Sequence, residues 1–348
     1  MVNARLSGRV GLALGSGAAR GWAHIGVIRA LEAAGIVPEI IAGTSVGAIV
    51  GGAYVSGQFD EFEAWVRALD RSNVVRNLDL SFRGGLFKGT QFFDFMSPKL
   101  PDRDIETLER PFAAVATDLE NGREIWLREG SLHSALRASV AMPGLITPAR
   151  RDGRWLVDGG LVNPVPVSLC RAMGAETVIA VDLNTTLLRR TLTPPGPDET
   201  RTEHEDRIEA GANAAEDGGS IEGAAAEGEV EGSPVPAAES SRLRRSIEVW
   251  ARELRDRIGG EGGNSQQTLP SLYEVLANSL NIMQIRITRS RMAGDPPELL
   301  ITPQLATFAL LDLDRGDEAI REGERAAHQA LASMAGAESS STGPMGRS

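Results

Sequence analysis

The sequence has a single cysteine, Cys170, among its 348 residues. One cysteine cannot form an internal disulfide, and such scarcity is typical of proteins from a reducing compartment. The first ten residues also lack the apolar stretch of a secretory signal. We therefore expect a cytoplasmic protein, and peripheral contact with the inner membrane surface stays open.

Long uninterrupted apolar runs are missing as well. The most apolar window, residues 38–57, carries one charge but contains five glycines and a central Thr44-Ser45. A membrane-spanning helix requires about 20 consecutive, predominantly apolar residues. We therefore interpret this window as a buried strand followed by a buried helix.

The chain also lacks any excess of positive charge. Its net charge of −11 arises within residues 198–239, which hold 13 acidic residues and two arginines, whereas the rest has 34 of each sign. Proteins that bind nucleic acids present a basic face. We therefore expect no nucleic-acid partner, and the oligomeric state does not follow from the sequence.

Composition divides the chain into four kinds of segment. Residues 9–185 and 265–335 have the apolar patterning of one folded domain. Residues 186–240 form an acidic insertion with few large apolar side chains, for which we predict disorder. Residues 241–260 place apolar side chains at helical spacing among arginines, which predicts an amphipathic helix that docks on the same domain or contacts a membrane. Residues 336–348 are predicted to form a flexible tail.

Short apolar runs alternate with helical patterns along the folded part. The predicted strands are residues 9–14, 39–42, 112–117, 124–127, 155–157, 177–181 and 299–301. The predicted helices are residues 21–34, 46–55, 269–285 and 314–331. This alternation predicts an α/β fold with a mainly parallel sheet that helices cover on both faces.

The pentapeptide Gly43-Thr44-Ser45-Val46-Gly47 joins an apolar strand to an apolar helix. In that setting G-x-S-x-G forms a nucleophile elbow, in which a sharp turn presents the serine hydroxyl. The flanking Gly43 and Gly47 would avoid clashes, and the helix N-terminus favours developing negative charge. A tight glycine-rich turn without chemistry is the plain alternative. We predict that Ser45 is a nucleophile.

A second small-residue loop, Gly15-Ser16-Gly17-Ala18-Ala19-Arg20-Gly21, also lies between a predicted strand and a helix. Its N–H groups could bind phosphate, as in a dinucleotide-binding fold, or stabilise an oxyanion. The dinucleotide pattern requires a third glycine where Arg20 stands and an acid at the end of the next strand. The loop therefore fits an oxyanion hole better.

Few histidines are present to act as the base for a serine. The four are His24, His133, His204 and His328, and none has the late position expected in a Ser–Asp–His triad. Asp158 ends a predicted strand and precedes Gly159-Gly160, so it would lie where open α/β sheets place their sites. Asp118 ends another strand and is a rival, and a turn aspartate is the plain alternative. Asp158 is the better candidate.

Taken together, the glycine loop, G-T-S-V-G and D-G-G resemble the patatin-like phospholipase family, above all its bacterial members related to neuropathy target esterase. Further matching segments are His24-Ile25-Gly26, Ala116-Thr117-Asp118-Leu119, Ala138-Ser139, Pro143-Gly144, Asp158-Gly159-Gly160-Leu161 and Asn163-Pro164-Val165-Pro166. The resemblance implies a three-layer α/β/α fold with a mainly parallel central sheet.

The same resemblance implies a serine acyl-hydrolase that uses a Ser45–Asp158 dyad without histidine and forms an acyl-enzyme on lipid carboxyl esters. N–H groups around Gly17 and Ala18 would bind the oxyanion, and Arg20 would hold the loop or meet a lipid phosphate. Family loops usually have four glycines, and here Ser16 and Ala18 replace two of them. We expect no metal ion and no cofactor.

Other functions stay open at this point. Seven of the nine phenylalanines lie within residues 59–95, where they would line an acyl-chain pocket or a lid, or form an ordinary core. The chain could also be a catalytically silent lipid-binding or regulatory protein, or a nucleotide-binding protein built on the glycine loop. The lipid substrate itself does not follow from the sequence.

Overall fold

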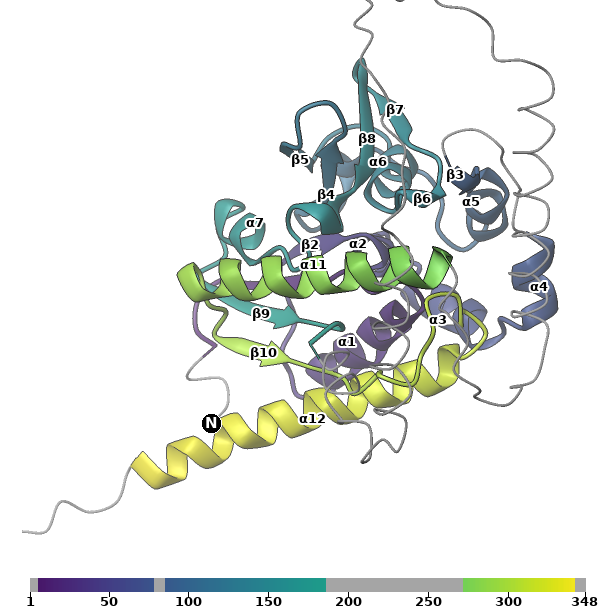
Figure 1. Ribbon diagram of the computed structural model, residues 1–348. Helices are drawn as coiled ribbons and strands as arrows, with labels where there is room; N and C mark the ends of the chain where they lie inside the picture. The colour runs from purple at the N-terminus through teal and green to yellow at the C-terminus, as the bar shows by residue number, and fades with distance from the viewer. Residues whose placement is uncertain (1–5, 78–84, 186–271, 342–348) are drawn as a thin grey trace, which may run out of the picture.

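The computed structural model describes residues 6–77, 85–185 and 272–341 (Figure 1). Both the acidic insertion predicted at 186–240 and the amphipathic helix predicted at 241–260 lie outside these residues. The domain boundaries therefore stay a prediction.

An eight-stranded sheet forms the centre of the protein, in the order β10-β9-β1-β2-β4-β8-β7, with β5 paired to β4. The five strands from β10 to β4 run parallel to one another: β10 (Leu299–Ile301), β9 (Thr177–Val181), β1 (Val10–Leu14), β2 (Ile40–Thr44) and β4 (Phe112–Asp118). The other three are antiparallel to their neighbours: β5 (Glu124–Leu127), β7 (Ala149–Arg151) and β8 (Arg154–Asp158). A mostly parallel sheet is therefore confirmed.

Helices cover both faces of this sheet, because successive strand residues point to opposite sides. Leu12 and Leu14 pack into a large core, whereas Ala13 faces a smaller core on the other side. The large core is covered by α1 (Ala23–Ala33), α2 (Val46–Val55), α3 (Phe59–Arg67), α5 (Thr90–Met96), α6 (Leu132–Ser139) and α12 (Gly316–Ser341). The smaller core is covered by α7 (Val167–Ala172) and by Met292 of α11 (Leu272–Gly294). These layers form the expected α/β/α fold.

Short elements complete the described chain. Three single-turn helices are η2 (Ala18–Trp22), η3 (Ile105–Thr107) and η4 (Gly159–Leu161), α4 spans Arg71–Arg76, and β3 (Gly85–Phe87) pairs with β6 (Gly144–Ile146). The helix predicted at 21–34 is thus split into η2 and α1, since the glycine loop continues into a tighter turn. α12 continues to Ser341, beyond the start of the tail predicted from residue 336. Residues 337–342 contain no Gly or Pro, and a helix stop appears only at Gly343-Pro344.

The phenylalanine-rich region belongs largely to the core. Phe59, Phe62, Phe87 and Phe93 are buried, and Phe92 and Phe95 pack against the large core, whereas Phe82 lies outside the described residues. The rings of Phe92 and Phe95 lie against Trp65, with centroid distances of 6.2 and 5.3 Å. An ordinary core is therefore the better interpretation of this clustering.

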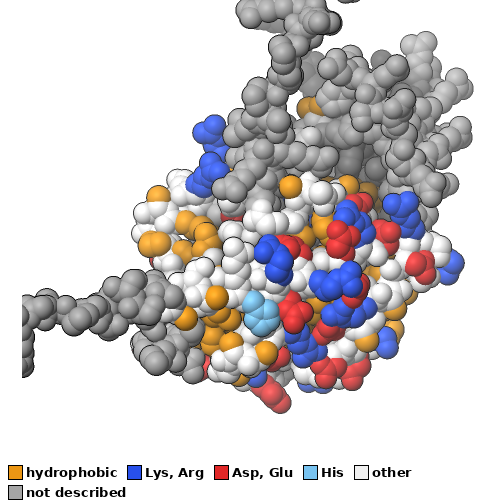
Figure 2. All heavy atoms as spheres, turned by 90° about the horizontal axis from the view of Figure 1, so that it is seen from below, with side chains coloured by type: hydrophobic (Ala, Val, Ile, Leu, Met, Phe, Trp, Pro, Cys, Tyr) orange, Lys and Arg blue, Asp and Glu red, His pale blue; other side chains and the backbone are white. Residues whose placement is uncertain are grey.

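Charges on the surface of α12 are mixed in sign. Figure 2 shows Lys/Arg and Asp/Glu side chains interspersed on the face that α12 covers, and Arg315–Glu318 and Arg325–Glu322 are ion pairs there. Such a face offers no field of one sign to a polyanion. Within the described ranges, no helix is both long and apolar enough to cross a bilayer.

Two glycines let α1 and α12 approach closely (Figure 1). A Cβ atom on Gly26 of α1 would overlap the backbone of α12 at Ile320, and one on Gly323 of α12 would overlap the carbonyl of Ala23. Since backbone atoms cannot rotate away, the helices would have to separate. The segment His24-Ile25-Gly26 thus has a packing role through Gly26.

We expect Gly26→Ala to lower the free energy of unfolding by about 1–3 kcal/mol, because it overpacks this helix contact. Gly294→Ala is the matched control: it has nothing within 4 Å of the added Cβ, and its effect should stay within about 0.5 kcal/mol. Urea denaturation of both variants measures the difference. Equal stability of the two would contradict the packing role of Gly26.

Candidate active site

Strand β4 brings the ends of two other strands together. β2 pairs with β4 up to Thr44 opposite Val115, and β8 pairs with it up to Asp158 opposite Ala116. β5 pairs with β4 at both of these positions, so it occupies the other edge of β4. β2 and β8 therefore share one edge and meet end to end, which places Ser45 beside Asp158.

Ser45 has the backbone strain of a nucleophile elbow. Its φ of 57° and ψ of −126° lie where residues other than glycine are rarely found. The turn is tight: a Cβ atom on Gly43 would overlap the backbone of Ala48, and one on Gly47 would overlap the carbonyl of Leu14. Both predicted elbow glycines are therefore required by close backbone approach.

Ser139, the last residue of α6, holds this strained turn. The Ser45 N–H donates to the Ser139 hydroxyl at 2.8 Å, and that hydroxyl donates to the Val115 carbonyl at 2.6 Å. Ser139 is fully buried. Its hydroxyl thus connects the elbow to β4, a role that the sequence motif Ala138-Ser139 did not reveal.

The Ser45 hydroxyl donates a hydrogen bond of 2.6 Å to Oδ2 of Asp158. The other carboxylate oxygen, Oδ1, accepts the Gly160 N–H at 2.7 Å, so the carboxylate is fixed from both sides. Ser45 and Asp158 are only 5% and 2% exposed. A Cβ atom on Gly159 would overlap the Val115 carbonyl, and one on Gly160 would lie 2.6 Å from Nε2 of Gln284. The predicted residues are therefore brought together.

Burial raises the pKa of Asp158 from 3.8 to about 6, although the hydrogen bonds from Ser45 and Gly160 act in the opposite direction. A carboxylate with a pKa near 6 is a stronger base than an ordinary one, yet it is mostly ionised at neutral pH. The carboxylate can therefore accept a proton from the serine hydroxyl.

His24 lies near the site but does not contact Ser45 or Asp158. Its Nε2 donates to the carbonyl of Gly15 at 2.7 Å, and the side chain is fully buried. Burial lowers the pKa of His24 to about 4, with the Gly15 hydrogen bond opposing, so the ring is neutral at physiological pH. His24 therefore supports the glycine loop.

The other histidines lie away from the site. His133 of α6 contacts the carbonyl of Leu100 and the ring of Phe93. His328 is on the exposed side of α12 near Glu324, and His204 lies outside the described residues. Among the residues that the structure describes, the hydrogen-bond partners of the Asp158 carboxylate are Ser45 and Gly160, not a histidine.

Two consecutive N–H groups of the glycine loop are left without a described acceptor. The N–H groups of Gly15, Ser16 and Ala19 donate to backbone carbonyls, whereas those of Gly17 and Ala18 have no partner in the described part of the chain. Ala18 has a φ of 49°, a strained conformation for a residue with a side chain. Within the described residues the loop therefore presents two adjacent donors without an acceptor, an arrangement that would suit an oxyanion.

Arg20 turns inward and holds the loop. Its Nε donates to the Gly17 carbonyl at 2.9 Å and its Nη2 to Oδ1 of Asn281 at 3.2 Å. It is 2% exposed, and burial lowers its pKa to about 10. Of the two predicted roles, loop support fits this geometry and contact with a lipid phosphate does not. Gly21 lies against Val46, whose side chain fills the place of a Cβ atom.

Gln284 of α11 joins the glycine loop from a distant part of the sequence. Its Oε1 accepts the Ser16 hydroxyl at 2.9 Å and the Asn184 amide at 3.0 Å. The side chain is 5% exposed. Sequence reasoning missed Gln284 and Asn184, because no local pattern marks a residue 268 positions away from its partner.

Asp118, the rival base, has a structural role. Its carboxylate accepts the N–H of Glu120 at 3.0 Å and the amide of Asn121 at 3.1 Å, and it pairs with Arg154 at 3.4 Å. It therefore stabilises the turn after β4. Asp158 is the aspartate that lies beside Ser45.

Comparison with known proteins identifies the family of this chain. A family model described as patatin-like phospholipase matches residues 12–171. An uncharacterised NTE family protein of Mycobacterium bovis is 35% identical over 335 residues, which cover 93% of this chain and 92% of that protein. The chain belongs to the patatin-like phospholipase family.

Two further matches cover only part of the other protein. Human patatin-like phospholipase domain-containing protein 6 is 35% identical over 182 residues, which cover 50% of this chain and 13% of that protein. Among solved structures, VipD from Legionella pneumophila aligns with a TM-score of 0.38 and 11% identity, over 93% of this chain and 66% of that one. Membership of this patatin-like family implies lipid hydrolase activity.

We expect Ser139→Ala to slow modification of Ser45 by a fluorophosphonate about 10- to 100-fold, because the elbow loses the anchor that positions the serine. The substitution should also lower the free energy of unfolding by about 1–3 kcal/mol, since the buried Ser45 N–H and Val115 carbonyl lose their partner. Ser134→Ala on the same helix removes a hydroxyl that only partly faces the interior, and is the control. Equal labelling rates for the two variants would contradict the anchoring role.

Asp158→Asn should stabilise the folded protein at neutral pH. Because the folded-state pKa of Asp158 is raised from 3.8 to about 6, the folded state binds more protons across this window, and stability falls as pH rises through it. Removing the charge should raise the free energy of unfolding by about 1–3 kcal/mol near pH 8 and should leave it unchanged below about pH 4. Urea denaturation at both pH values measures this, and a loss of stability near pH 8 would contradict it.

Proposed function

We propose that this protein is a serine acyl-hydrolase of the lipase, phospholipase or lysophospholipase type, which cleaves lipid carboxyl esters through a Ser45–Asp158 dyad. The observation that supports it most is the 2.6 Å hydrogen bond from the strained Ser45 to the buried Asp158. Strained backbone and a shifted pKa cost stability, so their coincidence in one place favours catalysis over a structural turn.

The first half of the reaction forms an acyl-enzyme. Ser45 Oγ attacks the ester carbonyl carbon while Asp158 Oδ2 accepts the serine proton. The carbonyl oxygen becomes negatively charged and would accept hydrogen bonds from the N–H groups of Gly17 and Ala18, which have no acceptor among the described residues. As the intermediate collapses, the bond to the alcohol breaks and Asp158 returns the proton to the departing oxygen.

Water completes the cycle. Asp158 takes a proton from a water molecule, whose oxygen attacks the acyl carbon, and the same loop binds the second oxyanion. As the acyl–serine bond breaks and the carboxylic acid leaves, Asp158 returns the proton to Ser45 Oγ, which restores both the hydroxyl and the carboxylate. The supporting features are the burial and raised pKa of Asp158, which let one carboxylate act as base in both halves.

Because a lipid substrate is found in membranes, the proposal includes peripheral contact of the protein with a membrane. The competing hypothesis of a catalytically silent lipid-binding protein predicts binding without turnover. A nucleotide-binding role is disfavoured by Arg20, which occupies the loop interior and donates to the Gly17 carbonyl there.

The proposal is tested by hydrolysis of p-nitrophenyl esters of graded chain length. Ser45→Ala should lower kcat/KM at least about 10,000-fold and Asp158→Asn about 1,000-fold or more, because each removes one member of a unit. His133→Ala should keep full activity, since that residue supports another part of the fold. The plot of kcat/KM against pH should rise through an apparent pKa of about 6, the value for Asp158.

Activity that survives Ser45→Ala would overturn the dyad. Absence of wild-type turnover on these esters and on phospholipids, in protein that is folded by circular dichroism, would favour the silent lipid-binding hypothesis.

A further inference from the structure

Helix α11 has its polar and apolar faces reversed relative to an ordinary surface helix. Such helices normally turn an apolar stripe toward the core and polar residues toward water. The inner face of α11 instead bears Asn281, Gln284, Thr288 and Arg291, spaced three or four residues apart. Gln284 and Thr288 are only 5% and 4% exposed. One apolar side chain, Ile285, is buried beside them.

Hydrogen bonds and an ion pair attach this inner face. Asn281 accepts from Arg20, Gln284 accepts from Ser16, and Arg291 pairs with Glu124 at 2.6 Å. Two of these partners belong to the glycine loop. The inner face is therefore fixed beside the glycine loop by polar contacts, and most of the large apolar residues in the first half of the helix are left to face outward.

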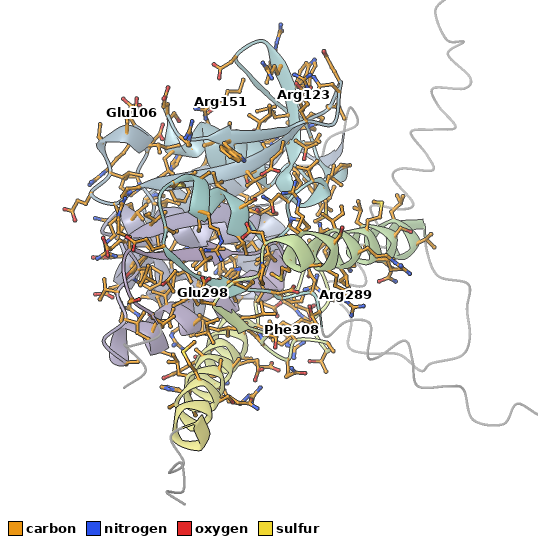
Figure 3. All side chains as sticks on the ribbon, turned by 90° about the vertical axis from the view of Figure 1, so that its left-hand side faces the viewer. Glu106, Arg123, Arg151, Arg289, Glu298 and Phe308 are labelled. Carbon is orange, nitrogen blue, oxygen red and sulfur yellow. The ribbon has the colours of Figure 1, made fainter. Side chains whose placement is uncertain are left out.

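The outer face exposes four large apolar side chains. Val275, Leu276, Ile282 and Met283 are 45%, 47%, 48% and 47% exposed. Residues seven positions apart, such as 275 and 282 or 276 and 283, lie on the same side of a helix. Figure 3 shows α11 projecting from the body of the protein. Ser279, also exposed, lies between the two pairs on this face. Exposed large apolar side chains gathered on one face of a projecting helix indicate a contact surface.

Two arginines continue the same face. Arg286 and Arg289 follow Ile282 by four and seven residues, both are exposed, and neither pairs with a described acid. Figure 3 labels Arg289 on this helix. Residues 275–294 contain no aspartate or glutamate. Apolar residues beside uncompensated arginines are the features of a helix that lies in the surface of an anionic membrane.

We propose that the outer face of α11, defined by Val275, Leu276, Ile282, Met283, Arg286 and Arg289, docks on an anionic phospholipid bilayer. The apolar side chains enter the boundary between headgroups and acyl chains, and the two arginines meet the lipid phosphates. The inner face then holds the glycine loop about one helix diameter, some 10 Å, from the lipid surface. The bilayer would then supply lipid to the site. The inference rests on the proposed function, because it takes lipid esters as the substrate.

A second copy of this chain is a weaker occupant. A symmetric contact would place the same patch of both copies together, and would bury Arg286 and Arg289 without an acid from residues 275–294 to pair with them. Anionic headgroups provide that compensation. Charge complementarity thus favours a lipid surface.

The test is co-sedimentation of the full chain with vesicles. The protein carries Ser45→Ala, so that lipid is not consumed, and the vesicles are pure phosphatidylcholine or equal parts phosphatidylcholine and phosphatidylglycerol. Adding Ile282→Asp and Met283→Asp should weaken binding to the mixed vesicles at least about tenfold, because two charges would enter an apolar boundary. Val37→Asp is the matched control, since Val37 is 49% exposed but lies far along the chain from α11; it should bind as the parent does.

The contribution of the two arginines to vesicle binding is tested separately. Arg286→Gln with Arg289→Gln should weaken binding to the mixed vesicles about fivefold for each arginine. Binding to pure phosphatidylcholine should change little. An equal loss on both kinds of vesicle would contradict the electrostatic part.

Three results would overturn the docking proposal. The first is that the protein binds neither kind of vesicle. The second is that the variant with both aspartates binds as well as the parent. The third is that those aspartates convert a dimer to a monomer in sedimentation velocity, which would make the outer face a self-association surface.

Hydrolysis of a short-chain soluble ester separates this inference from the proposed function. With Ser45 present, the paired aspartates should leave that rate unchanged, and ester turnover without vesicle binding would refute docking alone.

Discussion

The geometry of the candidate active site depends on the way β4 pairs with two strands along one edge. β2 arrives parallel and ends at Thr44, β8 arrives antiparallel and ends at Asp158, and their partners on β4 are adjacent residues. Two chain ends that meet head to head must both turn out of the sheet at the same place. The turn after β2 is the strained elbow at Ser45, and the turn after β8 begins with Asp158 and Gly159.

Rigidity around this junction keeps the strain in place. Ser139 accepts the Ser45 N–H and donates to β4, and Gly43, Gly47 and Gly159 allow backbone to approach backbone where a Cβ atom would overlap it. Strained backbone persists only where its surroundings determine it in several ways. The same enclosure removes water from Asp158 and raises its pKa. The same packing therefore maintains both the backbone strain at Ser45 and the raised pKa of Asp158, and these two features lower the stability of the folded protein at neutral pH.

The sequence predicted the features that are local. The G-T-S-V-G elbow, the glycine loop and Asp158 at a strand end follow from patterns within a few residues, and the parallel strands follow from apolar runs separated by helices. Three features could not be predicted. The antiparallel direction of β8 depends on pairing with distant β4, Gln284 reaches Ser16 across 268 positions, and the reversed faces of α11 appear only when its neighbours are known. The helical spacing of α11 was visible, but spacing alone does not say which face is buried.

The most direct measurement is the mass of the protein after brief exposure to a long-chain fluorophosphonate, with the modified residue located by peptide mass spectrometry. The proposed dyad predicts one adduct, on Ser45, in folded wild-type protein and none after urea denaturation, because the activated serine exists only where Asp158 accepts its proton. An adduct on another serine, or a Ser45 adduct formed equally fast in Asp158→Asn, would contradict the Ser45–Asp158 mechanism.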